Sequence, residues 1–182
     1  MPSKSLNVFR LLLQDLPGRI IINSLSFNFS KCFHRDRSSL TTAAFTATQT
    51  GEVATTEFRI KFASGDKPIS PWHDIPLKDG EFYNFINEIP KYTKAKLEVA
   101  TKETNNPIAQ DIKKGKLRDY HGPIYWNYGC LPQTWEDPNV LHPEVNCKGD
   151  NDPVDVVEIG AKALASGSLT KVQNNNHVAI VI

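Results

Sequence analysis

The sequence is poor in the features that mark zinc-finger, secreted and membrane proteins. Its three cysteines, Cys32, Cys130 and Cys147, are widely spaced and form no C-x-x-C pair. Structural zinc sites need closer ligand spacing, and an odd number of unclustered cysteines favours a reducing compartment. No apolar run approaches the ~18 residues of a membrane-spanning helix, so no membrane partner is expected. No repeat is visible, and 182 residues with 40% hydrophobic content can bury one sizeable core.

The charge is unevenly distributed behind a net charge of only +1. Residues 1–40 contain six Lys or Arg and two acidic residues, which leaves fifteen and eighteen of the totals of 21 and 20 for residues 41–182. A nucleic-acid binder would carry a basic stripe on its folded body. The mildly acidic body therefore excludes nucleic acid as the expected partner.

Residues 1–40 have the character of a basic leader. Their apolar residues recur at near-helical spacing and seven serines are scattered among them, which is typical of a mitochondrial presequence. Asp15 and Pro17 fit a presequence less well, and a disordered extension is the alternative. We expect residues 1–40 to be a targeting or disordered extension and residues 41–182 to form one domain. The expected location is the mitochondrial matrix or the cytoplasm.

Short extended segments dominate the rest of the chain. Alternating polar and apolar residues at 57–62 predict a strand with one buried face. Further strands are expected at about 82–89, 94–101 and 154–159. Proline-rich runs at Lys67-Pro68 and at 71–76 are interpreted as loops. Short strands separated by turn signals suggest a mainly β fold closed into a barrel.

Three carboxylates gather in the stretch G-D-N-D-P-V-D-V-V-E-I-G at residues 149–160. Asp150, Asp152 and Asp155 lie within six residues, and like charges this close raise one another's pKa. A divalent cation would neutralise them, and ligands that are all oxygen favour a hard ion such as Mg²⁺ or Mn²⁺.

Two other kinds of acidic loop also begin with closely spaced Asp and Asn residues. An ordinary solvated turn is one, because Asp, Asn and Pro are common turn residues. A calcium-binding EF-hand loop is the other, and it is excluded. Val154 and Ala161 stand where that loop needs oxygen ligands, and Asp155 stands where it needs glycine.

The full string resembles the D-x-D-P-x-D motif of the family I soluble inorganic pyrophosphatases. Further segments resemble eukaryotic-type members of that family and occur in the same order, so that the resemblance covers about residues 45–172: 45–51, 72–77, 86–90, 95–98, 106–111, 113–118, 127–129 and 132–138. The resemblance implies a five-stranded, OB-like closed barrel with peripheral helices. It also implies a homodimeric enzyme that hydrolyses inorganic diphosphate to two phosphates with Mg²⁺, for which Mn²⁺ could substitute.

The resemblance assigns roles to the acidic residues. Asp152 would be the base that orients the attacking water. Asp150 and Asp155 would be metal ligands, with Asp155 shared between two ions. Glu98 would bind a further Mg²⁺, and Glu88 matches the family's active-site glutamate.

Three more residues are expected to bind the substrate. Lys96 lies two residues before Glu98, so on a strand both would face the same side of the sheet; an exposed ion pair is the alternative. Arg118 resembles the arginine that grips phosphate, where a planar guanidinium suits bidentate binding. Tyr128 resembles a tyrosine that donates to the substrate, with a half-buried core residue as the alternative.

The chain departs from the family in two places. Between Arg118 and Asn127 the loop is short, and the family's second substrate tyrosine could be Tyr120 or Tyr125. The family also continues past residue 182 with another acidic loop that supplies ligands. We therefore expect a C-terminally truncated form, and a non-catalytic relative that pairs with a full-length subunit is the alternative function. Packing roles are expected for Trp72, Trp126 and Trp135.

Overall fold

The computed structural model of the chain describes residues 45–142, 146–173 and 178–181. The chain divides into residues 1–36 and 37–182, and all described residues belong to the second unit. The expected leader, residues 1–40, lies outside the described residues. Those residues form strands and turns without a helix, and none of their segments is a helix able to cross a bilayer.

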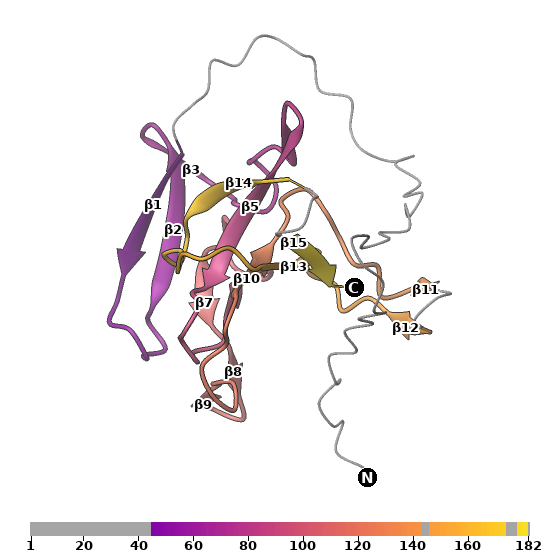
Figure 1. The fold of residues 1–182 in the computed structure, drawn as a ribbon. Coiled ribbons are helices and arrows are strands. Elements are labelled where there is room, and N and C mark those ends of the chain that lie inside the picture. Colours follow the sequence, from indigo (N-terminus) through magenta and orange to yellow (C-terminus); the bar gives the residue numbers. More distant parts are fainter. Residues whose placement is uncertain (1–44, 143–145, 174–177, 182) are drawn as a thin grey trace. The chain divides into compact units, whose positions relative to one another are not determined.

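The first sheet has the strand order β1-β2-β7-β6, and β3 also pairs with β2 (Figure 1). All of these pairings are antiparallel. The bounds are β1 Phe45–Thr50, β2 Arg59–Ser64, β3 Lys67–Ile69, β6 Leu97–Val99 and β7 Ile108–Gln110. In β2 the side chains of Ile60 and Phe62 are buried while Lys61 between them is exposed, which is the alternation of a strand with one buried face.

The second sheet has the order β14-β5-β10-β13-β15, with β4 added to one end of β5. Strand β5 is buried from Asn84 through Ile89 and pairs with β14 on one edge and with β10 on the other. The bounds are β4 Lys78–Asp79, β5 Phe82–Ile89, β10 Asn127–Cys130, β13 Asp155–Glu158, β14 Leu169–Val172 and β15 Val178–Val181. Two small hairpins complete the described strands: β8 Ile112–Lys113 with β9 Lys116–Leu117, and β11 Leu141–His142 with β12 Cys147–Lys148.

Most sequence expectations for strands are confirmed. The segments expected near 57–62, 82–89, 94–101 and 154–159 correspond to β2, β5, β6 and β13. The expected loop at Lys67-Pro68 is wrong, because these residues belong to β3. Among the described strands β3 pairs only with β2, so it is an edge strand. Proline, which lacks a backbone N–H, is tolerated at such an edge because no second strand needs that donor.

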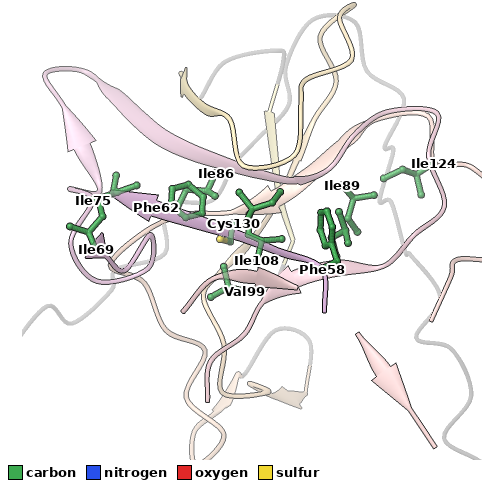
Figure 2. Packing of buried hydrophobic residues seen from close by; sticks show 12 residues of the cluster. Phe58, Phe62, Ile69, Ile75, Ile86, Ile89, Val99, Ile108, Ile124 and Cys130 are labelled. Atoms are coloured by element: carbon green, nitrogen blue, oxygen red, sulfur yellow. The ribbon is translucent and has the colours of Figure 1, made fainter. Parts of the chain in front are cut away.

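The larger of two apolar clusters lies between the two sheets. Figure 2 shows side chains from β2, β5, β6, β7 and β10 meeting in a single cluster. Ile86, Ile89 and Ile108 have no exposed surface, and a buried aliphatic side chain of this kind contributes about 1.5–3 kcal/mol. Trp72 and Trp126 pack against the cluster as predicted. The prediction fails for Trp135, whose side chain is 49% exposed.

A β-bulge joins the core to the region of the carboxylates. The pairing of β10 with β5 shifts between Tyr128 and Gly129, so that Glu88 has no Cα partner on β10. A Cβ atom on Gly129 would lie 1.9 Å from the carbonyl oxygen of Ile86, so only glycine permits this approach. The freed Glu88 side chain accepts a hydrogen bond from the backbone N–H of Val99, at 2.7 Å, and thereby links β5 to β6.

Replacing Gly129 tests this close approach. We expect Gly129→Ala to lower the free energy of unfolding by about 3 kcal/mol or more, because the backbones of β5 and β10 must separate to admit the methyl group. Gly122→Ala is the control, since an added Cβ there meets nothing within 4 Å. Urea denaturation followed by circular dichroism measures both. Equal midpoints for the two variants would contradict the account.

Candidate active site

A cavity of about 160 Å³ opens where β5, β6 and β10 meet the loop that precedes β13. Every site residue expected from the sequence lines this cavity except Arg118: Glu88, Lys96, Glu98, Tyr128, Asp150, Asp152 and Asp155. Residues from four separate segments therefore converge on one space. Their convergence depends on the sheet pairings of β5, β10 and β13 and on the Glu88 link to β6.

The Asp150-Asn151-Asp152 turn is held against the segment around Glu136. Asn151 adopts a left-handed φ of 76°, its N–H donates to the Glu136 carbonyl at 3.1 Å, and the Glu136 N–H donates to the Asp152 carbonyl at 2.9 Å. A Cβ on Gly149 would lie 2.3 Å from the carbonyl carbon of Glu136, so glycine permits the contact. The turn thus places the two aspartates beside a third carboxylate.

That third carboxylate, Glu136, is a residue that the sequence reasoning missed. Carboxylate oxygens of Glu136, Asp150 and Asp152 all lie within 4.8 Å of one another. The only available signal was its position in the family-like segment 132–138, which carried no assigned role. Its membership in the cluster depends on the turn contacts between residues distant in sequence.

These carboxylates are strongly perturbed by one another and by burial. Burial, together with the hydrogen bond and charge of Asp150, raises the pKa of Asp152 to about 9. Burial and the charges of Asp150 and Asp155 raise the pKa of Glu136 to about 7. Burial also raises the pKa of Asp155 to about 6, although the Tyr128 hydroxyl partly opposes this. The cluster cannot hold all its charges near neutral pH without a cation.

The donor set fits a hard divalent cation. The ligand atoms are carboxylate oxygens, and the Oδ1 atom of Asp152 is buried without a hydrogen-bond partner among the described residues. A cation would satisfy this oxygen and remove the repulsion that raises the pKa values. The oxygens of Glu136, Asp150 and Asp152 lie close enough to hold one ion directly or through its bound water, and Asp155 lines the same cavity.

Two tyrosines lie close to the carboxylates. The Tyr128 hydroxyl donates to Oδ2 of Asp155, and burial followed by the charge of Asp155 raises the pKa of Tyr128, so that it stays protonated. The Tyr120 ring packs edge-on against Tyr128 with centroids 6.5 Å apart. Burial raises the pKa of Tyr120, and charges of the cavity residues Lys96 and Asp155 also act on it. Tyr125 is instead 70% exposed and stacks edge-on with Tyr92.

The cations form a chain of ion pairs at the cavity wall. Lys96 contacts Glu98, and its Nζ atom lies 3.4 Å from Oδ2 of Asp111. Burial alone would lower the pKa of Lys96, but Glu98 and Asp111 outweigh it and raise that pKa. Lys96 and Glu98 line the same cavity, in agreement with the prediction that their spacing puts both on one side of a strand. Arg118 pairs with the same Asp111 oxygen and lies outside the cavity lining.

Glu88 occupies the buried end of the cavity. Its side chain is 3% exposed, and Cys130, 1% exposed, forms a hydrogen bond with it. Burial, followed by the charge of Asp155, raises the pKa of Glu88 well above its usual range, which favours its protonated form. A neutral carboxyl group can donate a hydrogen bond as well as accept one.

The fold and the site define a class: a mainly β protein whose oxygen-lined cavity suits a divalent cation next to fixed cations. Residues 85–174 match the family model of inorganic pyrophosphatase. The chain belongs to the inorganic pyrophosphatase family.

Its relatives and structural neighbours agree with this. The chain is 49% identical over 149 residues to soluble inorganic pyrophosphatase 1, chloroplastic, of Chlamydomonas reinhardtii, covering 79% of this chain and 53% of that protein. It is 56% identical over 126 residues to soluble inorganic pyrophosphatase 6, chloroplastic, of Arabidopsis thaliana, covering 68% and 42%. The crystal structure of type I inorganic pyrophosphatase from Toxoplasma gondii is similar with a TM-score of 0.68 and 38% identity, covering 71% and 60%. The mainly β, OB-like fold expected from the sequence is confirmed, but the expected peripheral helices do not occur among the described residues. The chain spans about half the length of the curated relatives it matches.

The raised pKa values predict how stability depends on pH. Unfolding returns these carboxyl groups towards the usual values, 3.8 for Asp and 4.5 for Glu, so the folded state holds protons that the unfolded chain has released. Without divalent cations, the free energy of unfolding should therefore fall as pH rises from about 4 to about 9. Excess Mg²⁺ should reverse this loss at pH 8.

Urea midpoints between pH 5 and pH 8, measured in EDTA and in Mg²⁺, check this expectation. Asp152→Asn should flatten the pH dependence in EDTA, because the neutral amide does not titrate. Asp66→Asn, on an exposed turn, should leave it unchanged. Stability that rises with pH in EDTA would show that the carboxylates are not held in mutual repulsion.

Proposed function

We propose that the chain hydrolyses inorganic pyrophosphate to two phosphates in a Mg²⁺-dependent reaction, with Mn²⁺ as a possible substitute. The observation that supports this most directly is that Lys96 and Tyr128 line the same cavity as Asp150, Asp152 and Asp155. The chain that forms this cavity is a member of the inorganic pyrophosphatase family. A pyrophosphate needs both kinds of group. Cations and donors bind its oxygens, while carboxylates hold metal ions and activate water.

Glu136, Asp150, Asp155 and, at the other side of the cavity, Glu98 would hold the divalent cations. Bound there, the cations would neutralise the carboxylates and lower the pKa of a water molecule. Asp155 lies between Tyr128 and the acidic turn, which suits the role of a shared ligand. The same neutralisation would lower the pKa of Asp152 from about 9 and allow it to act as a base.

The chain's own residues then divide the reaction among them. Asp152 orients the water and accepts its proton as the water oxygen forms a bond to one phosphorus and the bridging P–O bond breaks. Lys96 stabilises the negative charge that develops on the phosphate oxygens. Tyr128, which stays protonated, donates to the same oxygens if its hydroxyl exchanges Asp155 for the substrate. Glu88 holds the cavity floor through its hydrogen bond with Val99. Arg118 reaches the leaving phosphate if it exchanges Asp111 for the substrate.

Tyr120 is the second tyrosine of this proposed site. Its ring contacts Tyr128 and its hydroxyl feels the charges of Lys96 and Asp155, whereas Tyr125 lies on the surface. The choice that the sequence left open therefore falls on Tyr120.

A second candidate function is a non-catalytic subunit that pairs with a full-length relative or with its own copy. The exposed ring pair Tyr92 and Tyr125, at 62% and 70% exposure, favours it because large exposed aromatic side chains are enriched in protein interfaces. For location, we propose import into the mitochondrial matrix by residues 1–40, with the cytoplasm as the alternative. Residues 41–182 would then be the inorganic pyrophosphatase domain.

Loss of Asp152 tests the enzymatic proposal. Phosphate release from pyrophosphate with Mg²⁺ should fall by about 10²–10⁴-fold in Asp152→Asn, because a positioned base contributes about that much. Asp66→Asn is the control: it removes one exposed carboxylate that does not line the cavity, and it should retain the parent rate. Background rates in all three, from material that circular dichroism shows to be folded, would reject the enzyme and leave the non-catalytic subunit.

The two tyrosines make a matched pair for a finer test. Tyr120→Phe should lower kcat/KM by about tenfold or more, because a hydrogen bond to a charged oxygen is worth about 1.5–3 kcal/mol. Tyr125→Phe should change it by less than twofold. Steady-state kinetics at saturating Mg²⁺ measure both, and a larger effect at Tyr125 would overturn the assignment.

A further inference from the structure

The β8–β9 hairpin carries an unneutralised cluster of positive charge. Lys113, Lys114 and Lys116 are all exposed, and within residues 45–142, 146–173 and 178–181 none of them forms an ion pair. We call these three residues the basic hairpin. Two other cations close to the cavity are paired: exposed Lys94 with Asp119 and half-buried Arg118 with Asp111.

This arrangement is unfavourable for the isolated fold. Lys113 and Lys116 are direct cross-strand partners, and like charges placed opposite each other destabilise a hairpin. Lys114 has a left-handed φ of 53° and precedes Gly115, which gives a tight two-residue turn. The turn keeps the three ammonium groups on one short hairpin. A polyanion would relieve the repulsion among them.

The hairpin is anchored directly behind the cavity wall. Its two ends meet where the N–H of Arg118 donates to the carbonyl of Asp111 at 2.8 Å. Both ends also bind the backbone of Lys96: Asp111 donates to its carbonyl at 2.8 Å and its N–H donates to the Arg118 carbonyl at 3.0 Å. The Lys96 side chain itself lines the cavity.

The reach of the hairpin is comparable with the range of electrostatic forces. Residues 112–117 extend from these anchors by two or three residues, or about 10 Å at ~3.4 Å per residue. The Debye length at physiological ionic strength is about 8 Å. The three ammonium groups therefore lie roughly one Debye length from their anchors on Lys96, a residue that lines the cavity.

The cavity itself needs such help. Five carboxyl groups line it, those of Glu88, Glu98, Asp150, Asp152 and Asp155, against the one ammonium group of Lys96. These side chains by themselves offer no net attraction to a distant anion. We propose that the basic hairpin collects pyrophosphate and speeds its association with the cavity, an inference that rests on the proposed function. Fixed charges near an entrance raise association rates by about 10–10³-fold, and salt weakens the effect steeply.

Stopped-flow tryptophan fluorescence with Mg²⁺ and imidodiphosphate, a non-hydrolysable analogue, measures the association rate without turnover. Trp135 is a suitable reporter because its indole N–H donates to Asn151, in the acidic turn, at 3.0 Å. The test variant is K113Q/K114Q/K116Q. The control variant is K61Q/K67Q/K102Q, which loses the same charge at exposed lysines that do not line the cavity.

We expect the association rate constant of the test variant to fall by about tenfold at low salt and to approach the parent value near 1 M salt. Its dissociation rate should stay unchanged, and the control should lose less than about twofold. Equal association rates in the two variants, or a change confined to dissociation, would overturn the basic hairpin's role. If the parent binds and hydrolyses normally in that case, only this inference fails. A parent chain that binds no imidodiphosphate would overturn both this inference and the proposed function.

Discussion

Repulsion among carboxylates confined in one half-buried cavity is the constraint on which this site depends. Burial alone raises the pKa values of Asp152, Asp155 and Glu136, and each neighbouring charge raises them further. A folded chain tolerates such a cluster as protonated acids or around a cation, and only the second state leaves a base available near neutral pH. Protein stability, cation binding and the proposed chemistry are therefore governed by the same few oxygens.

The backbone holds these oxygens together through close approaches that only glycine allows. Gly129 lets β10 lie against β5, and the resulting bulge frees Glu88 to bridge to β6. Gly149 lets the acidic turn lie against the backbone of Glu136. In both places the absence of a side chain on glycine lets two backbone segments lie close together. The cavity lies where β5, β6, β10 and the acidic turn meet.

Much of the fold could be predicted from local pattern, and most of the cavity residues from the resemblance to the family. Alternating residues identified β2, and the spacing of Lys96 and Glu98 placed both on the same side of a strand; the structure has both lining one cavity. Prediction failed where a tertiary contact decides the outcome. Pro68 was taken for a loop because proline opposes strands, yet its place in β3, which pairs on one side only, removes that objection. Glu136 was missed because nothing near it in sequence indicates its carboxylate neighbours.

The sequence by itself determined the family, the mainly β class and the oxygen-donor chemistry, because these depend on residue types at short spacing along one chain segment. Tertiary structure alone decided which residues meet. It brought Glu136 to the aspartates, placed Tyr120 rather than Tyr125 beside Tyr128, and directed Arg118 to Asp111. These outcomes depend on strand register and on a bulge, which pair residues far apart in the chain, and short-range patterns carry no information about such distances.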